Sequence, residues 1–279
     1  MSYSDLFVIG NGFDLAHKMP TKYDDFKIWL FENDRIDVIQ ELQLAFPCMK
    51  DGEYLLWSDF ETAMGQYDID TVLNWGWDDL YITRTSIGNL NFDSPCSLLN
   101  IQLPDIIRDV FPAWVKSIPI ATIPAYKLPS QALYLSFNYT DTIERLYRIP
   151  ERQILHIHGR ASINEELVVG HNRSIDPSEY WDDHLDVREN NERMQRLVDM
   201  NNLRKPSFEL INQNESFFRL LNTVQTVTVL GHSCASIDYP YFRKVKMSIR
   251  DDAEWNFNPY SEEDVIRINT LKKEVGLHH

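Results

Sequence analysis

The stretch DLFVIGNGFDLAHKMP, residues 5–20, joins a short apolar run to two glycines that flank an asparagine. Its first five residues have the aromatic and β-branched composition of a buried strand, and a helix-like pattern follows Gly12. Glycines at such a turn let a phosphate or a ribose approach the backbone, although a plain tight turn uses the same pattern. Asp14 is placed to cap the helix or to accept hydrogen bonds from ribose hydroxyls. The loop by itself therefore predicts either a nucleotide site or a tight turn.

Composition narrows the class of protein. Of the 279 residues, 43% are hydrophobic, which is enough to bury a sizeable core. The formal net charge of -15 argues against binding of nucleic acid through a basic surface. The chain has no apolar run long enough for a membrane span and no basic leader before an apolar run, so we expect neither a span nor a signal peptide. The cytoplasm is the expected location, and three widely spaced cysteines agree with a reducing compartment.

Strand-like and helix-like segments alternate along the chain. Residues 21–127 carry apolar residues at helical spacing, which predicts a mostly helical insertion. The strand-like runs are DLFVI (5–9), ALYLSFN (132–138), QILHIHG (153–159), ELVVGHN (166–172), TVTVLGHS (226–233) and AEWNFNPY (253–260). Strands separated by helices favour an α/β fold with a Rossmann-like parallel sheet. We therefore expect residues 1–20 plus 128–279 to form a nucleotide-binding core, into which residues 21–127 are inserted.

Polar side chains follow several of these strands: Asn138, His156, His158, His171, His232, Ser233 and Asp238. The two-residue period of a strand places His156 and His158 on the same face. Because the carboxyl ends of parallel strands meet at one edge of a sheet, we expect these groups to surround a common ligand crevice. Each of them alone also has a structural interpretation, such as a capping asparagine or a hydrogen-bonded core histidine.

Taken together, these segments resemble a known family. GNGFDLAHKMP (10–20) aligns without a gap on the sirtuin loop Gly-Ala-Gly-(apolar)-Ser-x-x-x-Gly-Ile-Pro, with Pro20 at the position of the sirtuin proline. FNYTD resembles the asparagine-containing strand end of sirtuins, HIHG their catalytic His-Gly pair, and LGHSCASID their late nucleotide loop. More specifically, the segments that resemble the AbiH family of phage abortive-infection proteins are IGNGFDLAHKMPTKYDDF, WSDFE, FNYTDTIERLY, HIHG, VVGHN and LGHSCASIDYPYF.

The resemblance implies both a role and a site. It implies an abortive-infection protein with a sirtuin-like nucleotide site that hydrolyses NAD or NADP, as substrate, to nicotinamide and ADP-ribose. His158 would be the catalytic base, and Asn138 would hold the ribose or the attacking water. The residues implied in binding the dinucleotide are Gly10, Asn11, Gly12, Asp14, His232, Ser233 and Asp238. In the sirtuin loop, Asp14 and Lys18 replace a serine and a glycine. Three cysteines cannot supply the quartet of a deacylase zinc ribbon, so we expect neither deacylation nor a metal.

Two alternatives use the same residues differently. A metal-dependent hydrolase or nuclease would bind zinc or manganese through His156, His158, His171 and Asp14. A non-catalytic sensor would keep the nucleotide pocket and bind a nucleotide without chemistry. A nucleotide is the expected ligand of the proposed site, and a second copy of the chain or a phage-derived trigger is a further candidate partner.

Overall fold

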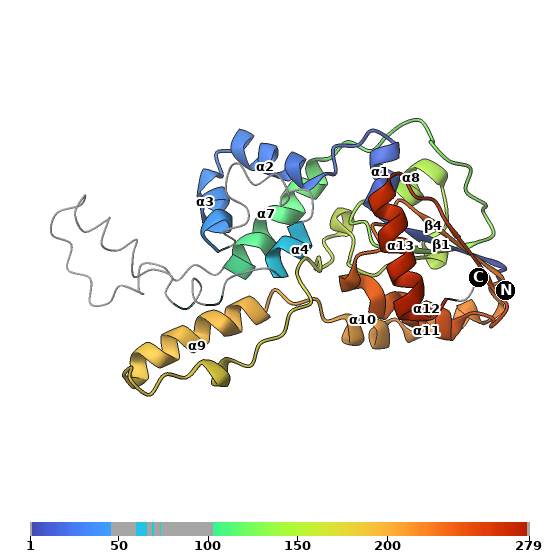
Figure 1. Cartoon of the computed structure of the whole chain (residues 1–279). Coiled ribbons are helices and arrows are strands. Elements are labelled where there is room, and N and C mark those ends of the chain that lie inside the picture. The colour runs from blue at the N-terminus through green and yellow to red at the C-terminus, as the bar shows by residue number, and fades with distance from the viewer. Residues whose placement is uncertain (1, 46–59, 66–68, 70–72, 74–102, 278–279) are drawn as a thin grey trace. The chain divides into compact units, whose positions relative to one another are not determined.

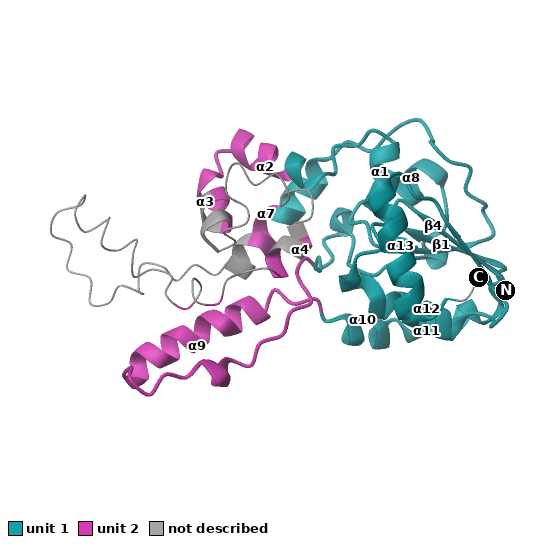
Figure 2. Cartoon of the chain, viewed as in Figure 1, with its two compact units in different colours: residues 1–25, 111–168, 206–279 teal, residues 26–110, 169–205 magenta. Residues whose placement is uncertain are grey.

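The structure is a computed structural model that describes residues 2–45, 60–65, 69, 73 and 103–277 (Figure 1). The chain divides into two compact units (Figure 2). Unit 1 comprises Met1–Asp25, Phe111–Val168 and Pro206–His279, and unit 2 comprises Phe26–Val110 and Val169–Lys205. This division differs from the expected domains at three places. Residues 169–205, expected in the core, lie in unit 2, and residues 21–25 and 111–127, expected in the insertion, lie in unit 1.

Within the described residues, unit 1 is built on a parallel sheet of five strands, which confirms the predicted fold class. The strands are β1 Asp5–Ile9, β2 Leu133–Ser136, β3 Ile154–His156, β4 Thr226–Leu230 and β5 Glu254–Phe257. Their spatial order is β3-β2-β1-β4-β5, and every neighbouring pair is parallel. The chain builds outward from β1 to β3 and then returns to β4 on the other side of β1. The boundary between β1 and β4 is therefore the switch point, where open α/β sheets bind ligands.

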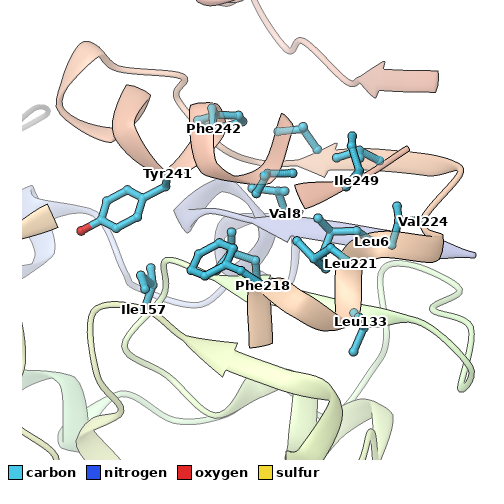
Figure 3. Close-up of a cluster of buried hydrophobic side chains, with 14 of the residues drawn as sticks. Leu6, Val8, Leu133, Ile157, Phe218, Leu221, Val224, Tyr241, Phe242 and Ile249 are labelled. Atoms are coloured by element: carbon cyan, nitrogen blue, oxygen red, sulfur yellow. The ribbon is translucent and has the colours of Figure 1, made fainter. Parts of the chain in front are cut away.

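Helices cover both faces of this sheet. One face carries α1 Asn11–Ala16 and α8 Thr142–Tyr147, and the other carries α10 Ser207–Gln213, α11 Glu215–Arg219, α12 Tyr239–Ser248 and α13 Glu262–Val275. Because successive strand residues point to opposite faces, Leu6 and Val8 of β1 enter the core beneath α10 to α13. There they lie beside Phe218 and Leu221 (Figure 3), whereas Ile9 enters the core beneath α1 and α8. Full burial of each such side chain stabilises the fold by about 1.5–3 kcal/mol.

In its described part, the predicted helical insertion forms α2 Tyr23–Glu32, α3 Ile36–Ala45, α4 Phe60–Gly65 and α7 Leu103–Ser117, whereas residues 118–127 are not helical. Of the WSDFE segment, residues 57–59 lie outside the described residues. Unit 2 also contains α9 Val187–Asn201. Among the described residues, short 3-10 turns occur at η3 Glu151–Gln153, η4 Ala161–Ile163, η5 Pro177–Tyr180, η6 Leu220–Thr223 and η7 Ser236–Asp238. In the part of the chain that the structure describes, no helix combines the length and the apolar surface that a membrane crossing requires.

One predicted strand does not form. In place of a strand at 166–172, the structure has irregular backbone with an isolated bridge between His171 and Arg204. The His171 N–H donates to the Leu203 carbonyl oxygen at 3.0 Å, and the His171 carbonyl oxygen accepts from the Lys205 N–H at 2.7 Å. A Cβ atom on Gly170 would lie 1.7 Å from the same Leu203 oxygen, so glycine permits this close pairing. The prediction that His171 stands at the end of a sheet strand is therefore wrong, and His171 belongs to unit 2.

The C-terminal elements form where the sequence predicts them. AEWNFNPY contains β5, and Ser261 caps α13. The Ser261 hydroxyl oxygen accepts from the Asp264 N–H at 3.1 Å, and the Asp264 carboxylate accepts from the Ser261 N–H at 3.1 Å. This reciprocal pair is a capping box, and it satisfies two N–H groups at the start of the helix.

Candidate functional site

The glycines of the opening loop allow two loop backbones to pack together. The N–H groups of Gly10 and Gly12 donate to the carbonyl oxygens of Leu230 (3.0 Å) and Gly231 (2.7 Å) at the end of β4. A Cβ atom on Gly12 would lie 2.8 Å from the Gly231 Cα, and one on Gly231 would lie 2.2 Å from the Phe13 amide nitrogen. Chain packing alone therefore accounts for these glycines, and the N–H groups of Gly10 and Gly12 are already used within the protein.

Asn11 and Ser233 are exposed residues of these two loops. The Asn11 side-chain amide donates to the Thr21 carbonyl oxygen at 2.7 Å, which ties the loop to the segment that follows α1. Lys18 in that segment has a φ of 61°, the left-handed conformation that favours glycine. This is the position at which the sirtuin loop has a glycine. Lys18 therefore adopts a backbone conformation that a glycine would adopt with less strain.

Asp14 is buried, with 1% of its surface exposed. The Thr140 hydroxyl donates to Asp14 Oδ2 at 2.6 Å, and the Thr142 hydroxyl donates to Thr140 at 3.1 Å. Burial raises the pKa of Asp14, and the threonine hydroxyls oppose this shift only in part. Its other oxygen, Oδ1, is buried without a hydrogen-bond partner among the described residues. Asp14 therefore ties α1 to the loop between β2 and α8 and lies beneath the surface.

Asn138 follows β2 and is held through its backbone. Its N–H donates to Ser136 Oγ at 3.2 Å, and its carbonyl oxygen lies 3.0 Å from His156 Nδ1. The residue is 7% exposed, and its side-chain Nδ2 has no hydrogen-bond partner among the described residues. A buried donor without a partner costs about 1–3 kcal/mol, which a ligand oxygen could recover. Asn138 therefore supplies a donor that the described part of the protein leaves unused.

Phe137 brings the ends of three strands together. Its ring contacts the ring of His158, after β3, at a centroid distance of 5.2 Å, and that of His232, after β4, at 4.4 Å. Tyr241 of α12 packs on Phe137 at 5.4 Å and on His158 at 5.5 Å. His158 is 2% exposed. His158 and His232 therefore lie with Phe137, the residue before Asn138, in one buried cluster at the C-terminal edge of the sheet.

His232 is paired with Asp238, which is also one of the predicted site residues. Its Nε2 lies 3.5 Å from Asp238 Oδ2, and its Nδ1 accepts a hydrogen bond from the Cys234 N–H at 2.9 Å. Because Nδ1 is an acceptor, the proton of the neutral imidazole is on Nε2, which faces Asp238. Asp238 is itself buried. The pair is therefore internal, whereas Ser233 beside it in sequence is exposed.

Comparison with known proteins identifies the family. A family model described as bacteriophage abortive infection AbiH matches residues 6–259, which is most of the chain. The chain belongs to the AbiH family. This membership supports a role in bacteriophage abortive infection. No curated protein and no solved structure matches the chain.

In this AbiH chain, a charged network lies beside the buried cluster. His156 Nε2 lies 2.7 Å from Glu144 Oε1, and the Arg160 guanidinium donates to the same oxygen at 3.1 Å. Burial acts against the charged form of His156, but the hydrogen bond and the charge of Glu144 outweigh it, so the pKa of His156 is raised. Burial also acts against the Glu144 carboxylate, but His156 and Arg160 outweigh it, and the pKa of Glu144 is lowered. The imidazole ring of His156 thus links Glu144 to the Asn138 carbonyl oxygen.

His171 belongs to a different environment in unit 2. Its Nε2 lies 3.0 Å from the Met200 carbonyl oxygen, and its Nδ1 accepts from the Arg173 N–H at 3.1 Å. Burial lowers the pKa of His171. Among the residues that the structure describes, no three His, Cys, Asp or Glu side chains are grouped so that they could hold a metal ion. The structure therefore does not assemble the metal-ligand set considered above, which was His156, His158, His171 and Asp14.

Four residues of this region were not among the predicted site residues: Phe137, Glu144, Arg160 and Tyr241. Each of them lies in or directly after a segment that resembles the family: FNYTDTIERLY, HIHG or LGHSCASIDYPYF. Their position in these segments was the signal available from the sequence. The atoms that they contact come from other elements, which only the fold brings close.

Proposed function

We propose that this AbiH protein acts in abortive infection by hydrolysing NAD or NADP to nicotinamide and ADP-ribose. The observation that carries the proposal is the unused, buried side-chain donor of Asn138. It lies at the end of β2, and His158 follows the adjacent strand β3. An amide and an imidazole can together hold a ribose hydroxyl or a water molecule and accept its proton. Both follow strands on one side of the β1–β4 switch point, where folds of this class bind nucleotides.

The other predicted residues have different roles in this proposal, and only some of them contact the dinucleotide. Asn11 and Ser233, which are exposed on the loops after β1 and β4, are the residues that we propose to contact the phosphates and the adenosine. Gly10 and Gly12 act by shaping the loop, since their N–H groups bond to the end of β4. Asp14 acts through Thr140 as a positioning residue. His232 and Asp238 form an internal pair that supports the loop carrying Ser233.

In the proposed reaction, the bond between the nicotinamide nitrogen and ribose C1′ breaks, and its electron pair leaves with nicotinamide, which becomes neutral. A water oxygen forms the new bond to C1′, and His158 accepts the proton that this water loses. Asn138 orients the water or the adjacent ribose hydroxyl through its side-chain amide. The aromatic rings of Phe137 and Tyr241 limit the entry of bulk water.

The proposal also requires the site to open. His158 is 2% exposed and Asn138 is 7% exposed, so a substrate has to displace part of their cover. Tyr241 packs directly on the His158 ring. A protein that destroys a central dinucleotide must be inactive before infection, and a covered site suits such a latent state. We therefore propose that infection uncovers the pair.

The test is incubation of the purified protein with NAD and, separately, with NADP, while nicotinamide and ADP-ribose are measured by chromatography. His158→Ala and Asn138→Ala should each lower the rate by about 100-fold or more, because general bases and positioning groups contribute on that scale. His184→Ala and Asn212→Ala, the same changes at exposed positions, should keep the wild-type rate. Because the site is covered, the four variants are also compared in phage-infected bacteria by measuring cellular NAD and NADP.

Equal activity in wild type, His158→Ala and Asn138→Ala would end the assignment. So would protection of infected cells with constant NAD and NADP. Binding of NAD in calorimetry without product, in purified protein and in infected cells, would instead support a nucleotide sensor. The burial of Asn138 and His158 makes the sensor the second candidate.

A further inference from the structure

A pocket of about 350 Å³ lies at the edge of the sheet in unit 1. Four consecutive residues, 154–157, line it. Because alternate residues of a strand point to opposite faces, four in a row can line one pocket only along the edge of the strand. Glu144 of α8 and Leu210 of α10 line the pocket from the two faces of the sheet. Since β3 is the end strand of the sheet, the pocket lies along its outer edge.

The backbone of β3 presents a specific pair of groups to this edge. The Ile157 N–H donates inward to the Ser136 carbonyl oxygen of β2 at 3.0 Å, so the peptide groups of Ile154 and His156 point outward. The Ile154 N–H donates to the Glu151 carbonyl oxygen, and the His156 carbonyl oxygen accepts from the Gly159 N–H. The remaining outward groups are the Ile154 carbonyl and the His156 N–H. One residue of a parallel peptide could pair with both of them.

The chain itself bonds to the turn that follows β3. The Val168 N–H donates to the His158 carbonyl oxygen at 2.9 Å. Val168 also lines the pocket. The chain therefore borders the pocket at the end of β3 and leaves the space beside residues 154–156 open.

The rim of the pocket is acidic. Its exposed charged residues are Glu151, Glu165 and Glu166. The two basic side chains of the wall, His156 and Arg160, are both bonded to Glu144, and Arg160 is also bonded to Glu151 at 3.1 Å. The charge that remains for a partner is therefore negative. Apolar contacts come from the side chains of Leu155, Val168 and Leu210, which also line the pocket.

We propose that the outer edge of β3 is a docking site for an extended, basic peptide segment of a partner protein. Basic side chains of the segment pair with the rim carboxylates, and apolar side chains between them contact the floor of the pocket. One residue of the segment bonds to the Ile154 carbonyl and the His156 N–H, as in strand addition to a sheet edge. This inference is independent of the proposed NAD hydrolysis.

The experiment measures the binding of a fluorescein-labelled hexapeptide of alternating arginine and valine to the full chain by fluorescence anisotropy. The wild type should bind this probe and not a probe of alternating glutamate and valine. The double substitution Glu165→Gln and Glu166→Gln should raise the dissociation constant roughly threefold to tenfold, since each removes one partly exposed ion pair. Glu262→Gln with Glu263→Gln, an adjacent exposed pair on α13 outside the pocket, should leave the constant unchanged.

A second probe tests the backbone pairing. The same peptide with N-methylated valines lacks the N–H groups of those residues and should bind several-fold more weakly than the unmodified peptide. Equal binding of the two peptides would overturn strand addition. Equal binding of the unmodified peptide to the Glu165/Glu166 variant and to the Glu262/Glu263 variant would show that the peptide does not bind at this pocket. Displacement of the probe by spermine at similar concentration would assign the pocket to small cations instead. Self-association of the chain that only the Glu165 and Glu166 changes abolish, without peptide binding, would assign the edge to a second copy.

Discussion

Asp14 is a carboxylate that the fold keeps away from water. It accepts a hydrogen bond from Thr140, and its Oδ1 has no partner among the described residues. Burial raises the pKa of Asp14 above its ordinary value of 3.8. The native state therefore keeps the Asp14 proton at a pH where the unfolded chain has released it. As the pH rises from 3.8 to the raised native value, the contribution of Asp14 to native stability is lost.

Asp14→Asn should stabilise the protein at neutral pH. Asparagine retains an oxygen that accepts from Thr140, and it removes the cost of a buried charge. We expect the free energy of unfolding to rise by about 1–2 kcal/mol at pH 7, measured by urea denaturation. The gain should shrink as the pH is lowered, because Asp14 then becomes neutral in the native state.

The control for this prediction is Asp24→Asn, the same change at an exposed position, which should alter the free energy by less than about 0.5 kcal/mol. A loss of stability in Asp14→Asn at pH 7 would mean that the native protein stabilises the anion. The assignment of Asp14 as a buried, mostly positioning group would then fail.

The positions of the candidate site residues in the fold could be predicted from the sequence to a larger extent than their contacts. Asn138 and His158 each follow a strand, and parallel strands end at one edge, so strand pattern alone places the two near each other. Whether the Asn138 amide has a partner depends on side chains from other elements. In the same way, Glu144 comes from α8 and meets His156 only in the folded chain. No spacing rule within a strand predicts such a contact.

At the scale of elements, the loops after β1 and β4 form one packed unit. Gly231 has a φ of 63°, and a Cβ atom there would lie 2.2 Å from the Phe13 amide nitrogen and 2.4 Å from the Gly12 carbonyl carbon. These are backbone atoms of the first turn of α1, so a side chain at Gly231 could be accommodated only if the loop after β4 separates from α1. Phe13 belongs to α1 and is fully buried. Separation would therefore also disturb the core beneath α1.

Gly231→Ala should destabilise the protein by about 3 kcal/mol or more, as the sum of left-handed strain and a backbone clash. The matched control is Gly276→Ala. Gly276 has a similar φ of 70°, but the nearest atom to its Cβ position is the flexible Lys246 Nζ at 3.0 Å. The control should cost only the left-handed strain, about 1 kcal/mol. The free energies of unfolding of both variants are measured by urea denaturation. Equal losses of free energy would show that the loop after β4 is not tightly packed on the chain after β1.

Element types could be predicted from composition more readily than element partners. Apolar runs such as β1 and β4 are buried on both faces, as expected for central parallel strands. Residues 166–172 have a similar apolar composition, but His171 bonds to Leu203 and Lys205, and Val168 bonds to His158 after β3, so the segment adds no strand to the sheet. Composition indicates that such a segment must be buried, and it does not specify the surface that buries it. The order β3-β2-β1-β4-β5 likewise depends on contacts between distant segments.

At the scale of the whole molecule, the two compact units carry separate stabilising groups. In unit 2, the Lys205 side chain is fully buried and its ammonium nitrogen lies 2.8 Å from Glu61 Oε2 of α4. The pair joins two segments of unit 2 that are far apart in sequence. All five strands of the described sheet belong to unit 1. Removing one partner of a buried ion pair costs about 3–5 kcal/mol, because the other charge is left without compensation.

Lys205→Met should therefore destabilise unit 2 without unfolding the sheet of unit 1. Hydrogen–deuterium exchange measured by mass spectrometry should become faster in α4 and α9 and stay unchanged in β1 and β4. Adding Glu61→Gln should restore part of the protection, since it removes the unpaired carboxylate. Lys273→Met, at an exposed position of α13, should leave exchange unchanged throughout the chain. If Lys205→Met also speeds exchange in β1 and β4, the two units unfold as one cooperative body, and the stability of the candidate site depends on the ion pair in unit 2.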